Sequence, residues 1–168
     1  MTMRRAFTAM ARRAQCPFIR RAQRGAAAIE LALLTLPLAA LTFGTTEFGR
    51  ALHQFNTLTK AVRDAARHQT TVAAGNTLPG RCLAFTGSSA NNGSSCSGSA
   101  LLPEMTLAQI TVCDRLACPN THRLQATGRG VVNLVTVSVT GVPFTSMAPF
   151  AMPSITFGTV SATMVQPL

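Results

Sequence analysis

The stretch RGAAAIELALLTLPLAALTFGTTEFGRALHQFNTLTKAVRDAAR, residues 24–67, decides how this chain of 168 residues folds. Its first part, residues 26–46, has a single charged residue, Glu30, and is otherwise apolar enough for a membrane helix. As a helix this part would extend roughly 31 Å, about the thickness of the hydrocarbon core of a bilayer. The sequence therefore predicts one transmembrane helix over residues 26–46.

Arginines are concentrated ahead of this segment. Residues 1–24 hold seven arginines and no acidic residue, whereas the rest of the chain carries a net charge of only +3 out of the total of +10. Because basic flanks remain in the cytoplasm, we expect a cytoplasmic N-terminus and an exported C-terminal region. Because the excess charge is confined to residues 1–24 and the chain has no Trp or Tyr, nucleic-acid binding is not expected.

An amphipathic helix is predicted over residues 47–72. Apolar residues recur there at spacings of three and four, which places them on one face of a helix. They are Phe48, Leu52, Phe55, Leu58, Val62 and Ala65. This pattern follows the apolar segment directly, so we expect one helix to continue through both.

The remaining residues, 73–168, predict a small exported β-sheet region. Residues 75–103 are rich in Gly, Ser and Asn and predict an exposed loop. Residues 135–140 alternate apolar and polar side chains, which is typical of a half-buried strand, and residues 107–113 are a second candidate. Residues 155–164 form a third candidate. In a regular strand, the apolar side chains of its two halves would point to opposite faces, and a one-residue bulge would bring them to the same face. Three antiparallel strands packed on the amphipathic helix give a small α+β domain.

Five cysteines divide between the two sides of the expected membrane. Cys16 lies in the basic leader and is expected to stay reduced in the cytoplasm. The four exported cysteines are an even number, which favours two disulfides with three connectivities. We prefer the pairs Cys82–Cys96 and Cys113–Cys118, because each closes a short loop that contains turn residues. The connectivity stays open at this point.

Other chemistry has little support in the sequence. A metal site formed by Cys113, Cys118 and His122 is the alternative to disulfides, but its spacing matches no strong zinc pattern. Nucleophile, zinc-protease and phosphate-loop motifs are absent from the sequence, and the few exported acidic residues are scattered. We therefore expect no catalytic residues, no metal and no cofactor, and do not expect an enzyme.

The junction between leader and helix resembles the cut site of type IV prepilins. Gly25 directly precedes the apolar run, and Glu30 is the fifth residue after it. The resemblance implies cleavage between Gly25 and Ala26 by a membrane prepilin peptidase, after a basic leader of residues 1–25. It also implies that Glu30 pairs with the new amine of Ala26 on a neighbouring subunit. The alternative is that Glu30 simply reaches the nearby interface.

The whole stretch is similar to the TadE-like family, the minor pseudopilins of tight-adherence (Flp-type) pilus assembly. Leu31 departs from the pattern, because the family commonly has an aromatic residue there. Residues 135–150 and 154–164 also resemble the family's closing strand pair around a Pro-Phe turn. The motifs that carry the resemblance are Arg24-Gly25, Ile29-Glu30, Leu36-Pro37-Leu38, Glu47-Phe48-Gly49-Arg50, Asn56-Thr57-Leu58 and Ala65-Ala66-Arg67.

This resemblance implies a pilin-like α+β fold, which the two expected disulfides would stabilise, and a role in assembling a tight-adherence, type IVb-like pilus. The implied location is the bacterial inner membrane, with the C-terminal domain in the periplasm or exposed in the pilus. The implied partners are other pilins and pseudopilins, the pilus assembly platform, the prepilin peptidase and inner-membrane lipid. Two alternatives are an uncleaved membrane anchor with a periplasmic binding module, and a soluble protein released by signal peptidase after the apolar run.

Overall fold

The computed structural model describes the backbone of residues 17–128 and 130–166 and the side chains of residues 25–128 and 130–166. The leader arginines and Cys16 lie outside the described side chains. The described residues fall into two compact units, divided between Leu41 and Thr42.

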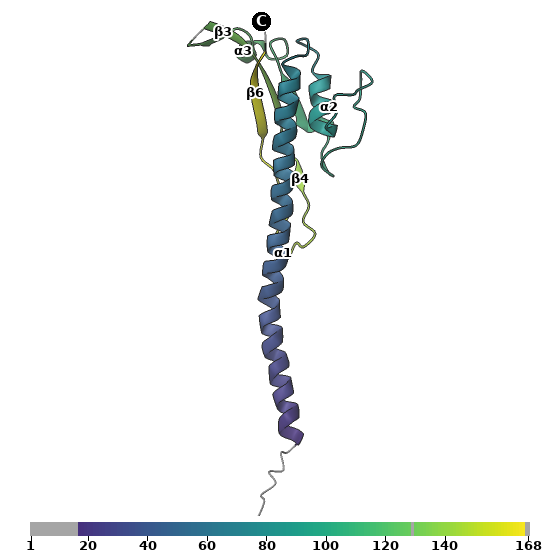
Figure 1. Cartoon of the computed structure of the whole chain (residues 1–168), viewed down its shortest axis with the longest axis vertical. Helices are drawn as coiled ribbons and strands as arrows, with labels where there is room; N and C mark the ends of the chain where they lie inside the picture. The colour runs from purple at the N-terminus through teal and green to yellow at the C-terminus, as the bar shows by residue number, and fades with distance from the viewer. Residues whose placement is uncertain (1–16, 129, 167–168) are drawn as a thin grey trace, which may run out of the picture. The chain divides into compact units, whose positions relative to one another are not determined.

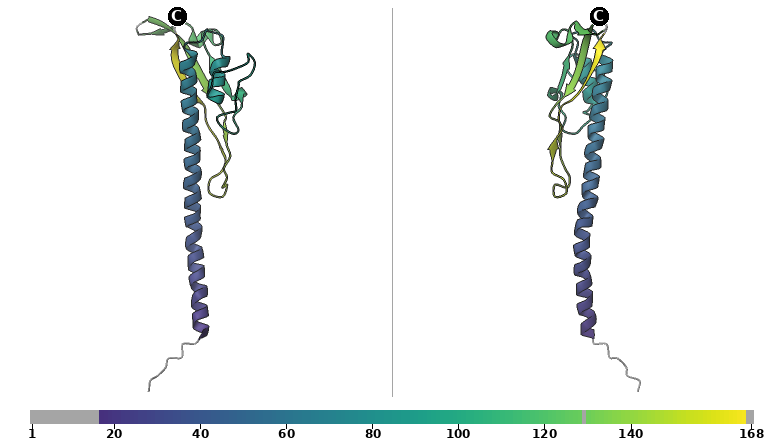
Figure 2. Two further views of the ribbon diagram at one scale, coloured as in Figure 1. Left: turned by 45° about the vertical axis from the view of Figure 1, so that its right-hand side comes forward. Right: turned by 90° about the vertical axis from the view of Figure 1, so that its left-hand side faces the viewer.

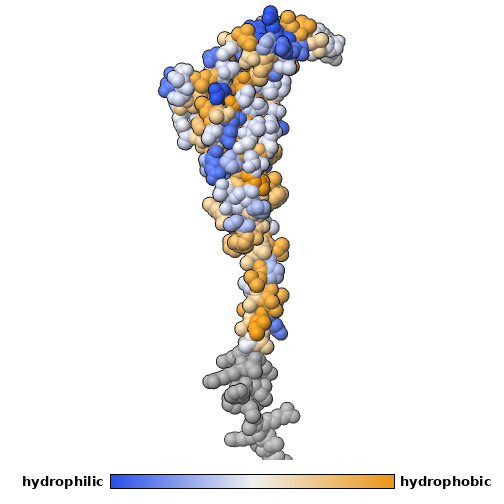
Figure 3. Space-filling model, turned by 180° about the vertical axis from the view of Figure 1, so that it is seen from behind, coloured by the Kyte–Doolittle hydropathy of each residue, from blue (hydrophilic) through white to orange (hydrophobic). Residues whose placement is uncertain are grey.

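The first unit is formed by the N-terminal part of helix α1 (Pro17–Gln69). The helix continues through Pro37, although proline removes one backbone N–H. The leucines and the isoleucine of this part are between 62% and 71% exposed, so no described part of the chain covers them. Figure 3 shows hydrophobic side chains along this part of α1. Such a surface is stable only where lipid or another protein covers it.

The second unit joins the C-terminal part of α1 to short helices and strands (Figure 1). These elements are α2 (Leu78–Thr86), the 3₁₀ helix η1 (Leu107–Gln109), β1 (Ile110–Cys113), α3 (Pro119–His122), β2 (Gln125–Thr127), β3 (Gly130–Val139), β4 (Pro143–Phe144), β5 (Ile155–Thr156) and β6 (Val160–Gln166).

Strand β3 organises the sheet of this unit. It pairs antiparallel with β1, β2 and β6, and Val137 lies opposite both Val112 and Ala162. A separate antiparallel pair is formed by β4 and β5. Figure 2 shows β3 and β6 side by side next to the C-terminal part of α1. The predicted α+β class, a long apolar helix packed on small antiparallel sheets, is confirmed.

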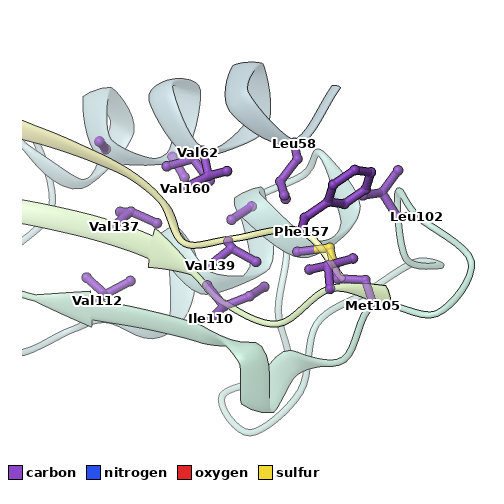
Figure 4. Packing of buried hydrophobic residues seen from close by; sticks show 14 of the residues in the cluster. Leu58, Val62, Leu102, Met105, Ile110, Val112, Val137, Val139, Phe157 and Val160 are labelled. Carbon is purple, nitrogen blue, oxygen red and sulfur yellow. The ribbon is translucent and has the colours of Figure 1, made fainter. Parts of the chain in front are cut away.

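The core lies between α1 and one face of this sheet. Val135, Val137 and Val139 are fully buried, which confirms the strand predicted from their alternation with polar residues. Leu58 and Val62 from α1 pack against this layer (Figure 4). Burying an aliphatic side chain of this size contributes about 1.5–3 kcal/mol, so these contacts hold the sheet on the helix.

The predicted apolar face of α1 is only half correct. Leu58, Val62 and Ala65 are buried as expected. Phe48, Leu52 and Phe55 are 57%, 45% and 39% exposed, and Glu47 and Ala51 are buried in their place. The reason is that the sheet covers only the last turns of α1, while the chain between β4 and β5 contacts a different face near residue 47.

Residues 75–103 are not entirely a loop, which corrects the sequence analysis. Helix α2 forms there, with Pro79 in its first turn and Gly87 at its C-cap in the left-handed region. The buried residues of α2 are small (Gly80, Cys82 and Ala84), so its sequence shows no clear helical repeat of large apolar side chains. Gly80 lets α2 approach α1 closely, because a Cβ atom there would push aside the amide end of the Gln69 side chain.

Two expected strands are shorter than their patterns suggested. Residues 107–109 form η1, whose Thr106 and Gln109 make a reciprocal capping box, so β1 starts only at Ile110. Residues 155–164 are not one bulged strand, because the chain leaves β5 and begins β6 after Gly158. Pro143–Phe144 is strand β4 and not the expected turn.

Two disulfides lie in the second unit. Cys82 is joined to Cys96, with a Cα–Cα distance of 5.1 Å, and Cys113 to Cys118, with 5.3 Å. These are the two pairs preferred from the sequence. Closing the loop between Cys82 and Cys96 stabilises the fold by about 3 kcal/mol, because it restricts the unfolded chain.

Asp114 fastens the end of α1 to the β1–α3 connection. Its side chain is fully buried and accepts hydrogen bonds from the backbone N–H groups of Gly75, Leu116 and Ala117. Burial raises the pKa of Asp114, but the three N–H donors, with Ala117 the strongest, outweigh it. The pKa of this carboxyl therefore lies below its ordinary value of 3.8.

We expect Asp114 to make stability depend on acid pH. Because its pKa is lower in the folded chain, its contribution is complete above the ordinary pKa and is lost as pH falls through the folded value. Calorimetry of the full chain in detergent at pH 7 and pH 2 is expected to show a larger loss of stability for the native chain than for Asp114→Asn. Equal losses would contradict this role, since all other carboxyls are common to both chains.

Candidate membrane and assembly site

The expected cut site lies on an open stretch of α1. Gly25 and Ala26 are exposed, and a Cβ atom at Gly25 would meet no neighbour within 4 Å. The backbone here is helical, so cleavage requires local unwinding. Glycine makes unwinding easier by roughly 0.5–1 kcal/mol relative to alanine. The site is therefore accessible and locally weak.

Glu30 lies on the exposed surface of the first unit, four residues after Ala26. Residues four apart lie on the same face of a helix, so the carboxylate and the start of the expected mature chain share one side of α1. An ionisable side chain in an apolar helix is costly in lipid, which makes Glu30 a candidate functional residue.

Small residues occupy the other side of the same helix. A shallow apolar groove is lined by Ala28, Ala32, Thr35 and Ala39, together with two leucines. With 3.6 residues per turn, this groove and Glu30 face nearly opposite directions. The hydroxyl of Thr35 donates to the carbonyl of Leu31 (2.7 Å), so the groove presents little unsatisfied polarity. Small residues allow a second helix to approach closely.

Immediately after the apolar segment, Glu47 and Arg50 attach α1 to the chain between β4 and β5. Arg50 Nη2 lies 2.9 Å from Glu47 Oε2 and 2.6 Å from the carbonyl oxygen of Thr145. Glu47 Oε2 also accepts the backbone N–H of Met147, at 3.2 Å. The Arg50 guanidinium lies 4.5 Å from the ring centroid of Phe144, a cation–π contact.

The hydrogen bond from Arg50 lowers the pKa of Glu47. Burial opposes this effect, and the donors of Met147 and Ser146 add to it, so the pKa of Glu47 lies below its ordinary value of 4.5. The pair therefore stays ionised and mutually neutralised at neutral pH. Sequence reasoning missed this contact; the available signal was an acid and an arginine three residues apart at the end of an apolar run.

The residues of α1 described above lie in a segment that matches a known protein family. Residues 25–67 match the family of TadE-like proteins. The matched segment begins at Gly25, includes Glu30, Glu47 and Arg50, and confirms the resemblance drawn from the sequence. Neither curated proteins nor solved structures give a match to the chain.

The TadE-like segment also carries the membrane candidate. Within the described residues, α1 is the one helix long and apolar enough to cross a membrane, and its apolar window is not buried by protein. This agrees with single-pass anchoring. The exposed side chains of Phe48 and Leu52 extend the apolar surface past residue 46.

The four disulfide cysteines lie outside the TadE-like segment. Cys113 and Cys118 are bonded to one another, which removes both thiolates from the alternative metal site with His122. The ring nitrogens of His122 lie 2.7 Å from Thr121 Oγ1 and 2.8 Å from Thr136 Oγ1. Both ring nitrogens of His122 are therefore already hydrogen-bonded, and the bond to Thr136 links α3 to β3.

Proposed function

We propose that this chain is a pseudopilin that acts in assembly of a tight-adherence, type IVb-like pilus. It enters the inner membrane through residues 26–46, with its N-terminus in the cytoplasm and its disulfide-bonded domain in the periplasm or on the pilus. The observation that carries this proposal is the TadE-like match over residues 25–67, which combines Gly25 and Glu30 with an uncovered apolar helix.

Processing is the first step of the proposed role. A prepilin peptidase hydrolyses the peptide bond between Gly25 and Ala26, which consumes one water, removes the basic leader and leaves a free amine on Ala26. The apolar helix stays in the membrane as an anchor. The accessibility of Gly25 and the absence of a Cβ atom there support this step.

Assembly is the second step. The new amine of one chain and Glu30 of its neighbour neutralise each other, because two opposite charges in a medium of low dielectric constant attract strongly. The groove formed by Ala28, Ala32 and Ala39 supports close packing by a second helix on the opposite side. The amine at residue 26 of one chain meets residue 30 of the next, so the contact is head-to-tail and can repeat along a filament.

The proposed partners are other pilins and pseudopilins, the assembly platform, the prepilin peptidase and inner-membrane lipid. The chain itself is proposed to be structural and not an enzyme, without nucleic acid as a partner. The faces of α1 carry recognition, and the disulfide-bonded domain keeps the C-terminal part of α1 folded outside the membrane.

The test is the N-terminus of the membrane-embedded product in a bacterium with a tight-adherence system. Intact mass and N-terminal sequencing are expected to give Ala26 for the native chain, and the uncut leader for Gly25→Leu. Gly44→Leu is the matched control, because Gly44 also lies in α1 with open space around it. That control is expected to be cut normally.

Two outcomes would contradict the proposal. A native membrane product that keeps all seven leader arginines would favour an uncleaved anchor with a binding module. A soluble product that begins near Thr45 would favour release by signal peptidase.

A further inference from the structure

The chain between β4 and β5, residues 145–154, here called the β4–β5 loop, has an apolar tip without a protein cover. Met147 is 81% exposed and Phe150 is 72% exposed. The sequence of residues 130–168 contains no Asp, Glu, Lys or Arg. Exposed side chains of this size in an uncharged loop favour an apolar environment over water.

The loop is fixed beside α1 at the end of the expected membrane segment. The rings of Phe43 and Phe150 meet edge to face, with centroids 5.5 Å apart and planes at 78°. Glu47 and Arg50 hold Met147 and Thr145 through the hydrogen bonds described above. The loop can be followed in both views of Figure 2, running back along α1. Phe150 therefore lies at the level of Phe43.

The contact between Phe43 and Phe150 determines how deep Phe150 would lie in the membrane. Phe43 is three residues inside the end of residues 26–46, about 4.5 Å along a helix. Segments that lie in the membrane surface bury their apolar face about 5–10 Å into the boundary between headgroups and acyl chains. If residues 26–46 span the bilayer core, Phe150 lies about 4.5 Å inside its boundary, close to the shallow end of that range.

Five of the eight backbone N–H groups of the β4–β5 loop have hydrogen-bond partners within the protein, which lowers the cost of placing the loop where there is little water. N–H groups in lipid need partners within the protein. Ala151 and Met152 donate to the carbonyl of Ala148, and Ala148 and Ser146 donate to serine hydroxyls. Pro149 and Pro153 have no N–H to satisfy. The buried Glu47, paired with Arg50, completes the polar contacts at the base of the loop.

We propose that the β4–β5 loop inserts into the lipid interface beside α1, as a second membrane contact on the periplasmic side. The occupant of this surface is the bilayer, because the loop tip is continuous with Phe43 of the membrane segment and carries no charge. The proposal rests on the membrane placement of residues 26–46 in the proposed function. Two contacts fix the rotation of the domain about the helix axis, which one helix cannot do.

The absence of Trp and Tyr from the chain makes a direct test available, because a single introduced Trp is then the dominant fluorophore. The full chain, cut or uncut, is reconstituted in vesicles of phosphatidylcholine and phosphatidylglycerol, with or without bromine on the acyl chains. Phe150→Trp reports the loop and Leu36→Trp reports the membrane segment. Leu116→Trp is the control, because Leu116 is 63% exposed and adjoins Gly75, beyond the C-terminal end of α1.

Phe150→Trp is expected to lose emission with brominated lipid and to resist quenching by aqueous acrylamide. Leu36→Trp is expected to behave likewise, and Leu116→Trp to show the reverse. Met147→Trp is a second reporter at the same loop and is expected to be quenched by brominated lipid if Phe150→Trp does not fold.

The remaining outcomes separate the two proposals. If Leu36→Trp escapes brominated lipid, the membrane placement fails and the proposed function fails with it. If Leu36→Trp is quenched but the loop reporters are open to acrylamide, only the loop insertion is overturned. A third outcome is that the loop reporters are not quenched by brominated lipid and become open to acrylamide when added lipid dilutes the protein. This result would show that a second copy of the chain covers the loop, and it would overturn lipid insertion.

Discussion

Replacing Glu30 by glutamine is expected to abolish pilus assembly while the chain still reaches the membrane and loses its leader. Glutamine keeps the size of the side chain and removes its charge, so the amine of Ala26 on a neighbouring chain finds no counter-charge. Insertion becomes easier, because a neutral side chain costs less in lipid. The measurement combines electron-microscopic counts of pili with immunoblots of the membrane fraction.

Asp64→Asn is the matched control for this substitution. Asp64 is an exposed acid on the same helix, in the part that lies outside the membrane segment, and its loss removes the same charge. Normal piliation is expected for the control. Normal piliation with Glu30→Gln would leave Glu30 as a residue that only reaches the interface, and the assembly role would have to be abandoned.

Replacing Phe144 by alanine is expected to destabilise the second unit by about 3–5 kcal/mol, the usual range for removing a buried aromatic ring. Phe144 is 1% exposed, and its ring lies 6.1 Å from that of Phe157 and beneath the guanidinium of Arg50. The substitution leaves a cavity and removes the cation–π contact together. Calorimetric unfolding of the detergent-solubilised full chain measures the loss.

Phe48→Ala is the control for Phe144→Ala, since Phe48 is 57% exposed and no described part of the chain buries it. Its expected effect on stability is within about 0.5 kcal/mol. Similar losses for both variants would show that β4 contributes little to the core and that Glu47 and Arg50 hold the β4–β5 loop without help from Phe144.

The sequence predicted those parts of the fold in which one local pattern determines the result. Val135, Val137 and Val139 alternate with polar residues, so the inward face of β3 follows from the period of two. The apolar run of residues 26–46 likewise determines an uncovered helix. The two disulfides could be preferred because each joins neighbours along the chain, at separations of 14 and 5 residues.

Contacts between distant residues were not predictable in this way. Burial of Glu47 depends on Met147, one hundred residues later in the chain, and no periodicity encodes that meeting. An amphipathic pattern identifies an apolar face but not what covers it. The pattern therefore places Phe48 and Leu52 on the same apolar face as Leu58 and Val62, although both remain exposed. Helix α2 was missed because Gly80, Cys82 and Ala84 pack closely with little apolar volume.

The Cys82–Cys96 disulfide has a consequence for variation of the domain surface. It brings the ends of an exposed segment to 5.1 Å, and Asn91 pairs with Cys96 just inside the ring. Doubling the length of such a closed loop costs only about 0.6 kcal/mol of closure entropy. Added residues next to Gly93 would thus leave the helix and sheet undisturbed, which makes this ring a place where an inserted epitope is expected to be tolerated.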